Sequence, residues 1–167
     1  MNRRNTIKYL GVGMLSFTGC LSMPNKNSKA EDCPSFNSSK SVCADTTVGD
    51  IVVLPSRQTV DQKRKSVRIT LYNRSASTFT QTGLWELRRR SESGEWVRAG
   101  PEDRALSPVF VPAGESTNWH LDFASSESEV GTITIPENGT NTYAFVVPGQ
   151  VGDEEVSNYL CTFDIKF

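Results

Sequence analysis

The 167-residue sequence has few of the residues from which most catalytic and metal sites are built. Its single histidine, His120, excludes the paired-histidine motifs of zinc hydrolases. A glycine-rich phosphate loop, a dinucleotide-binding fingerprint and a G-x-S-x-G nucleophile motif are all absent, and the cysteines show no Cys-x2-Cys spacing. No apolar run reaches the ~18–20 residues that a membrane-spanning helix requires. We therefore predict a non-catalytic protein with no cofactor and no metal.

An excess of positive charge is also missing, since the formal net charge is −1 at pH 7. Arg3, Arg4 and Lys8 are the only charged residues in positions 1–19, and without them 15 Lys and Arg stand against 19 Asp and Glu, a net charge of −4. Residues 88–90 are consecutive arginines, but alternate side chains of a strand point to opposite faces, so we interpret them as a solvated strand end. Binding to a phosphate backbone requires clustered Lys and Arg, and we expect no nucleic-acid partner.

The first 19 residues have the pattern of a secretory signal peptide. Residues 1–8 form a basic start, residues 9–18 form an apolar run, and the small residues Thr18 and Gly19 precede Cys20. The stretch RRNTIK resembles a twin-arginine export signal, although Thr6 stands where that signal usually has an aromatic residue. Export by the twin-arginine route and export by the general secretory route therefore both stay open.

The stretch FTGC at the end of this signal resembles a lipobox. In lipoproteins the lipobox cysteine carries the lipid and becomes the first residue of the mature chain, so the resemblance implies that Cys20 is lipidated. The lipid of such lipoproteins has at least two acyl chains, and two chains hold a protein stably on a membrane, whereas one does so only weakly. We therefore expect a lipid anchor in the cell membrane, with the protein on its extracytoplasmic face.

Residues 20–44 indicate a flexible tether. Asn, Ser and Lys dominate and apolar side chains are rare, so this segment has too little apolar surface to order itself. As a coil of ~22 residues it would hold the following domain on the order of 25 Å from the anchor. The predicted organisation is a signal peptide at 1–19, a lipidated Cys20 with its tether at 20–44, and one domain at 45–167.

The remaining residues carry the alternation of apolar and polar side chains that is typical of half-buried strands. In SVRITLYN, residues 66–73, the side chains of Val67, Ile69 and Leu71 share one face. Similar runs separated by turn residues predict an all-β protein, an antiparallel β-sandwich of about 7–8 strands. The side chains expected to share its core are Trp85, Leu87, Trp119, Leu121, Tyr143, Phe145, Phe163 and Ile165.

Several of these stretches together resemble the immunoglobulin-like domain of bacterial and archaeal surface lipoproteins. They are SVRITLYN, GLWELRRRSESGEWVRAG, VPAGESTNWHLDF and YAFVV, within residues 50–167. The match departs before Tyr143, where such domains usually have a Pro-Gly turn and this chain has ENGTN. The resemblance implies an immunoglobulin-like sandwich. With its acidic domain and twin-arginine-like signal, the whole chain resembles haloarchaeal surface lipoproteins.

Four cysteines are present, at positions 20, 33, 43 and 161. If Cys20 carries a lipid, three are left, and outside the cytoplasm two of them are expected to form a disulfide. Cys33–Cys43 would close a small loop in the tether, whereas Cys43–Cys161 would tie the end of the tether to the last strand. Both pairings stay open. Under the first, Cys161 is a buried free thiol that packs like a small apolar residue.

His120 and Asp122 lie two positions apart on one predicted strand and therefore share a face. A histidine beside a carboxylate can act as a general base, but the alternation places this pair on the solvent side, and we interpret both as surface residues. Three N-x-S/T sequences, at Asn37, Asn73 and Asn138, fall in the tether or in turns, where a glycan fits.

Two functions follow from these observations. The first is a membrane-anchored surface lipoprotein whose immunoglobulin-like domain is a structural or protein-interaction module, with another cell-surface or membrane protein as its partner. The second is a protease-inhibitor-like or ligand-carrier sandwich, in which the loop at 99–108 would block a protease. Immunoglobulin-like scaffolds host unrelated functions, so the fold alone does not choose between them.

Overall fold

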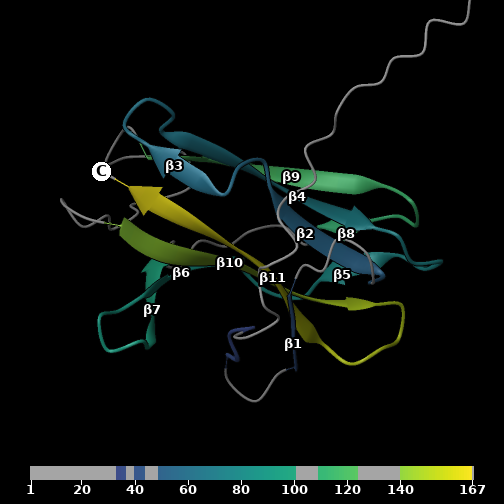
Figure 1. Cartoon of the computed structure of the whole chain (residues 1–167). Helices are drawn as coiled ribbons and strands as arrows, with labels where there is room; N and C mark the ends of the chain where they lie inside the picture. The colour runs from purple at the N-terminus through teal and green to yellow at the C-terminus, as the bar shows by residue number, and fades with distance from the viewer. Residues whose placement is uncertain (1–32, 37–39, 44–48, 101–108, 124–139, 167) are drawn as a thin grey trace, which may run out of the picture. The chain divides into compact units, whose positions relative to one another are not determined.

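The computed structural model describes residues 33–36, 40–43, 49–100, 109–123 and 140–166 (Figure 1). Within these ranges the secondary structure is entirely β, as predicted, and no helix there is long and apolar enough to cross a membrane. The chain divides into two units, Met1–Glu31 and Asp32–Phe167, and every described residue belongs to the second. The predicted signal peptide, Cys20, Asn37, Asn138 and residues 101–108 of the 99–108 loop lie outside the described residues.

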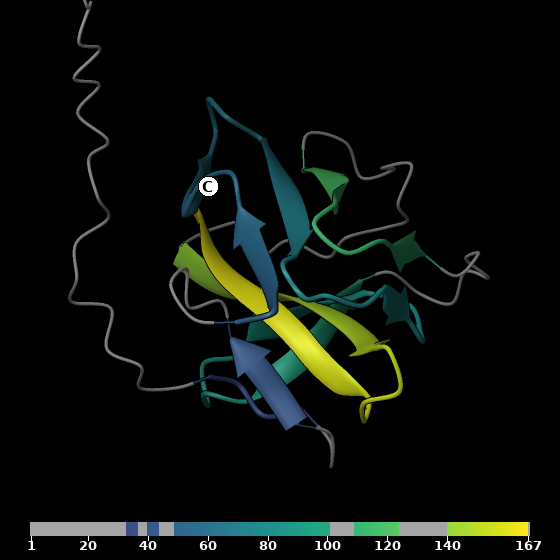
Figure 2. The ribbon, with the colours of Figure 1, turned by 90° about the vertical axis from the view of Figure 1, so that its right-hand side faces the viewer.

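Two long antiparallel strands form the middle of the larger sheet (Figure 1). β10 (Thr140–Val151) pairs with β11 (Ser157–Lys166) over ten residues. Two short strands run parallel to β11 on its other side, β1 (Lys40–Cys43) and β3 (Thr59–Asp61), and Figure 2 shows β1 beside β11. The strands beyond β10 are β5 (Phe79–Gln81), β6 (Glu86–Arg90), β7 (Trp96–Gly100) and β8 (Phe110–Val111).

Among the residues that the structure describes, the smaller sheet has three antiparallel strands. They are, in spatial order, β2 (Ile51–Pro55), β4 (Ser66–Asn73) and β9 (Ser116–Asp122). The predicted alternation of β4 is confirmed, because Val67, Ile69 and Leu71 are buried while the residues between them are exposed or half-buried. This sheet therefore turns one apolar face toward the larger sheet.

An apolar core lies between the two sheets. Trp119 of β9 packs on Phe145 of β10 with ring centroids 5.3 Å apart, and Phe123 packs on Phe163 of β11 at 6.3 Å. Burial of such side chains is the main favourable contribution to folding, about 25 cal/mol for each Å² of apolar surface. Seven of the eight residues predicted for the core belong to this cluster and are buried, and the eighth, Trp119, is half-buried and packs against it. The predicted all-β sandwich of two packed sheets is confirmed.

The number of strands differs from the prediction of about 7–8, because the described residues contain eleven. The additional strands are short, since β1, β3, β5 and β8 have between two and four residues each. Alternation is not recognisable over so few positions. β1 and β3 also depart from the predicted antiparallel arrangement, since both run parallel to β11.

Residues 33–36 and 40–43 pack against the sandwich, although the sequence predicted a flexible tether over 20–44. β1 pairs with the first half of β11, and the side chain of Phe36 is only 4% exposed. This order is not visible locally because the segment itself has few apolar residues, whereas Phe36 is buried by residues far along the chain. The folded domain therefore includes Cys33 and does not begin at residue 45.

Candidate functional site

The larger sheet has a second buried face, outside the core between the two sheets. This face is turned away from the smaller sheet, and we call it the outer face. Ala144 and Val146 of β10 and Leu160 of β11 form its apolar centre, and all three are buried, although their neighbours Phe145 and Cys161 point into the core. Successive residues of a strand point to opposite faces, so both strands are buried on two sides.

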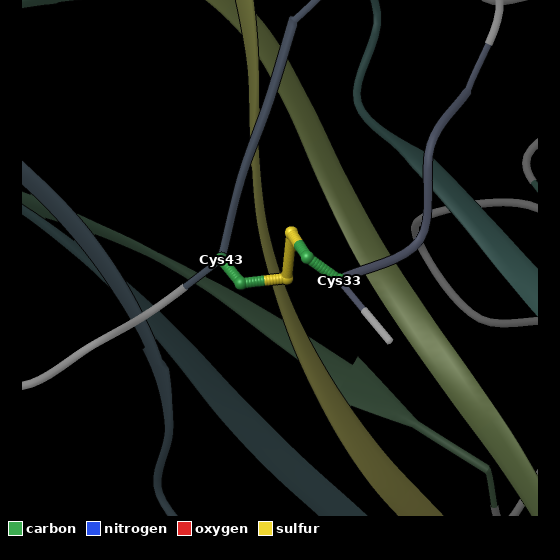
Figure 3. Close-up of a disulfide and its surroundings, with 2 residues drawn as sticks. All are labelled: Cys33 and Cys43. Carbon is green, nitrogen blue, oxygen red and sulfur yellow. A yellow bond between two sulfur atoms is a disulfide. The ribbon is translucent and has the colours of Figure 1, made fainter. Parts of the chain in front are cut away.

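The cover of the outer face is the segment Cys33–Phe36, which we call the strap. The Phe36 ring clusters with the apolar centre and meets the Trp96 ring edge-on, with centroids 6.0 Å apart. The Nδ2 atom of Asn158, on β11, donates a hydrogen bond of 3.3 Å to the carbonyl oxygen of Phe36. A disulfide joins the first residue of the strap to Cys43 of β1 (Figure 3). The strap is thus fastened to three strands, β1, β7 and β11.

Arg88 of β6 also contacts the strap. Its guanidinium lies over the Phe36 ring, 4.7 Å from the centroid, in a cation–π contact. Its Nη2 and Nε atoms donate to Glu86 Oε2 at 2.7 Å and 2.8 Å. Only 18% of the Arg88 side chain is exposed, so the prediction of a solvated strand end is wrong for this arginine. Arg90, at the end of the strand, is exposed as predicted.

An open hollow of about 200 Å³ adjoins the strap. Its apolar lining comes from Phe36, Val146, Pro148 and Val156, and its polar lining from Glu86, Arg88 and Asn158. Val156 is 41% exposed. The apolar surface under the strap therefore continues into solvent, toward the turn between β10 and β11.

The disulfide Cys33–Cys43 is one of the two pairings that the sequence left open. The rival pairing, Cys43–Cys161, is not formed, although β1 and β11 are neighbours as it requires. The register is the reason, because Cys43 lies opposite Leu160 on the outer face, whereas Cys161 points into the core as a free, buried thiol. Burial raises the pKa of the Cys161 thiol, which keeps it protonated and unreactive.

Cys161 should therefore resist alkylation in the folded protein. In a Cys20→Ser variant, which leaves three cysteines, we expect iodoacetamide to label none in the native state and one in guanidinium chloride without reductant. Peptide mapping by mass spectrometry should place that label on Cys161. A label on Cys33 instead would show that Cys43 and Cys161 are paired and would contradict the structure.

His120 and Asp122 lie on β9 on either side of buried Leu121, so they are turned away from the core, as predicted. His120 is exposed and lies opposite Arg68 of β4. Among the described residues, no group of three or more His, Cys, Asp or Glu side chains is placed to hold a metal ion. The surface around His120 is polar and open to solvent.

Asn73, one of the three predicted glycan acceptors, is a buried structural residue. It is 1% exposed, and its Nδ2 atom donates to the carbonyl oxygens of Ser77, Val111 and Pro112 at 2.8–3.1 Å. Its Oδ1 atom accepts hydrogen bonds from the N–H and the hydroxyl of Ser75. A glycan is attached through Nδ2, so the folded domain has no room for one at Asn73 and that prediction is wrong.

Phe36 is the candidate residue that sequence reasoning missed. It is the only aromatic residue between Cys20 and Cys43. A lone aromatic side chain within a small cysteine-bounded loop was the available signal, because a loop that is merely a spacer has no use for one. What Phe36 packs against is not deducible locally, since Asn158 lies 122 positions further along the chain.

No family model matches the sequence, and no curated protein matches it either. Several solved structures have a similar arrangement of strands. The YadV chaperone (15% identity, TM-score 0.44) aligns with 71% of this chain, and the periplasmic chaperone SfaE (9% identity, TM-score 0.44) aligns with 70%. The chain spans 52% and 57% of those two chaperone chains. PapD-like domain 7 of human CEP192 (11% identity, TM-score 0.39) aligns with 80% of this chain, and the alignment covers 96% of the CEP192 domain. Similarity at this level identifies neither a family nor a function.

Proposed function

We propose that the protein is a lipid-anchored lipoprotein on the extracytoplasmic face of the cell membrane, and that its immunoglobulin-like domain is a non-catalytic protein-interaction module. Three features support this. The N-terminus has the basic start, apolar run and FTGC sequence of a lipoprotein signal. The domain contains a disulfide. Its surface includes an apolar face that a short segment of the chain covers only in part.

The arrangement of the four cysteines carries the proposal. Cys33 and Cys43 are joined, and disulfides persist outside the cytoplasm but are rare within it. Cys161 is buried in the core. Of the three cysteines that the structure describes, none is therefore left at the surface to pair with Cys20, which follows the apolar run after a single glycine, Gly19. Lipidation gives that residue a role that fits its position.

The proposed anchor would hold the domain closer to the membrane than a tether ending at residue 44. Residues 21–32 are the segment between Cys20 and the strap. As the coil that the sequence predicts for the tether, these 12 residues would have an end-to-end distance on the order of 20 Å. Partners within reach would accordingly be proteins of the same membrane.

A Cys20→Ser variant tests the anchor. Without the lipobox cysteine no lipid is attached, so we expect the protein to move to the aqueous phase in Triton X-114 partitioning, or to accumulate at the mass of the uncut precursor. Ser22→Ala is the matched control, because it changes a neighbouring residue and keeps the cysteine, and it should stay in the detergent phase. A Cys20→Ser protein that stays in the membrane with unchanged mass would overturn the proposal.

A further inference from the structure

We propose that the outer face is a recognition surface for an aromatic side chain on an extended polypeptide segment, that Phe36 occupies it as an internal ligand, and that the Cys33–Cys43 disulfide keeps it occupied. This role deepens the interaction function proposed above and does not depend on the lipid anchor.

Phe36 is held by the contacts that binding sites make with an aromatic ligand. The floor under the ring is apolar, Trp96 of β7 forms a wall, and Arg88 of β6 covers the ring with a cation. Asn158 adds a hydrogen bond to the main-chain carbonyl of Phe36, a group that any extended segment can offer in the same place. Four strands of the sheet thus build a site for one side chain.

The strap is separable from the sandwich. Phe36 and the apolar centre of the outer face form a cluster distinct from the core between the sheets. β10 and β11 pair with each other over ten residues, and β1 pairs with β11 through its own backbone. None of these pairings uses the strap. Lifting Phe36 therefore uncovers the outer face while the two sheets stay packed on each other.

The hollow beside Phe36 shows that the strap covers only part of the outer face. The free space lies next to the ring and is bordered by Pro148 and the exposed Val156. An external segment with its aromatic ring at the position of Phe36 has room to place a further apolar side chain there. The partner that fits is therefore an extended segment with an aromatic residue and a nearby small apolar one, which gains contacts that the strap lacks.

The disulfide decides whether the strap competes with such a partner. While Cys33 is bonded to Cys43, Phe36 stays close to its site and excludes an external ring by its high effective concentration. A dithiol can open the bond by thiol–disulfide exchange: the dithiol is oxidised to a disulfide, and the two cysteines each receive one electron and one proton. Cys33 is exposed to such a reagent. The opened loop regains chain entropy when the strap leaves the sheet.

A peptide copied from the strap is the direct probe. Fluorescein-labelled SPSFNS has the sequence of residues 33–38 with serine in place of the cysteine, and its binding to the full chain in detergent can be followed by fluorescence anisotropy. The receiving protein carries Phe36→Ala, Cys33→Ser and Cys43→Ser, which empties the site and removes the disulfide. We expect saturable binding to this variant, and binding at least about tenfold weaker to the oxidised wild type, whose site is occupied.

Matched controls separate recognition of the ring from other effects. A peptide with alanine in place of phenylalanine should bind the open variant at least about tenfold more weakly. Adding Trp96→Leu should weaken binding of the original peptide, whereas Val97→Ala, on the opposite face of β7 and 39% exposed, should not. Equal binding to the oxidised wild type and the open variant, or binding that does not need the ring, would overturn the proposal.

A second measurement covers the case in which the triple variant does not fold. Dithiothreitol added to the wild type should bring about peptide binding as the disulfide opens, with an unchanged far-UV circular dichroism spectrum. Unfolding on reduction would overturn the claim that the strap is separable, and a reduced, folded protein that binds no peptide would overturn the claim that the disulfide keeps the site occupied. Neither result would alter the outcome of the Cys20→Ser experiment, which tests the anchor alone.

Discussion

Replacement of Gly149 by alanine is expected to lower the free energy of unfolding by about 3 kcal/mol or more, or to prevent folding. Gly149 lies on β10, and a Cβ atom there would overlap the ring of Phe79 and lie 2.9 Å from the carbonyl oxygen of Thr80. The ring has nowhere to move, because Phe79 is fully buried and meets the Tyr159 ring edge-on at 5.5 Å. Denaturant unfolding followed by tryptophan fluorescence gives the difference.

Gly49→Ala is the matched control for this substitution. A Cβ atom at Gly49 would make ordinary contacts, the nearest at 3.5 Å to the carbonyl oxygen of Ile51, so we expect a change within about 0.5 kcal/mol. In a Phe79→Leu background Gly149→Ala should cost much less, since the ring that it meets is gone. Equal losses for Gly49→Ala and Gly149→Ala would contradict this packing.

Asn73→Asp is expected to cost about 3–5 kcal/mol at pH 7. The substitution replaces Nδ2, which donates to three carbonyl oxygens, with a carboxylate oxygen that faces them, and at 1% exposure the charge also loses its hydration. Both effects would raise the pKa of the new carboxyl in the folded protein above its unfolded value of about 3.9. The loss of stability should therefore grow as the pH rises above about 4 and shrink as the pH falls.

Asn118→Asp provides the comparison, because Asn118 is an exposed residue of β9. It makes the same chemical change at the surface and should alter the free energy of unfolding by less than about 0.5 kcal/mol. Unfolding of both variants and the wild type is to be measured at pH 7 and pH 5. Similar losses at the two sites, or a loss at Asn73 that increases toward low pH, would show that the buried hydrogen bonds are not as described.

The core of the sandwich could be predicted because a strand that buries one face has apolar side chains at every second position. Val67, Ile69 and Leu71 on β4 show this period, and it places them in the core without any knowledge of their neighbours. The short strands could not be predicted in this way. Their positions depend on backbone pairing with β10 and β11, to which the side-chain pattern contributes little.

The strap could be predicted only in part. The uninterrupted apolar run from Tyr143 to Val147 is a sign that a strand is buried on both faces, but the residue that covers its outer face lies about a hundred positions earlier in the chain. The disulfide depends on an offset of a single position, since Cys43 lies opposite Leu160 and not opposite Cys161. The spacing of the cysteines in the sequence does not give this register, which is known only once β1 and β11 are paired.

Burial on both faces also changes what holds β10 in place along its neighbours. A strand with one apolar face resists slipping by one residue, because the slip would turn every apolar side chain to water. Between Tyr143 and Val147 every side chain of β10 is apolar or aromatic and buried, so a slip there exchanges one such side chain for another and solvent does not oppose it. Differences in side-chain volume oppose the slip instead. Ala144 leaves space for the Phe36 ring on one side, Phe145 stacks on Trp85 at 4.8 Å on the other, and Gly149 admits the ring of Phe79, so that differences in side-chain size, rather than in polarity, align this strand.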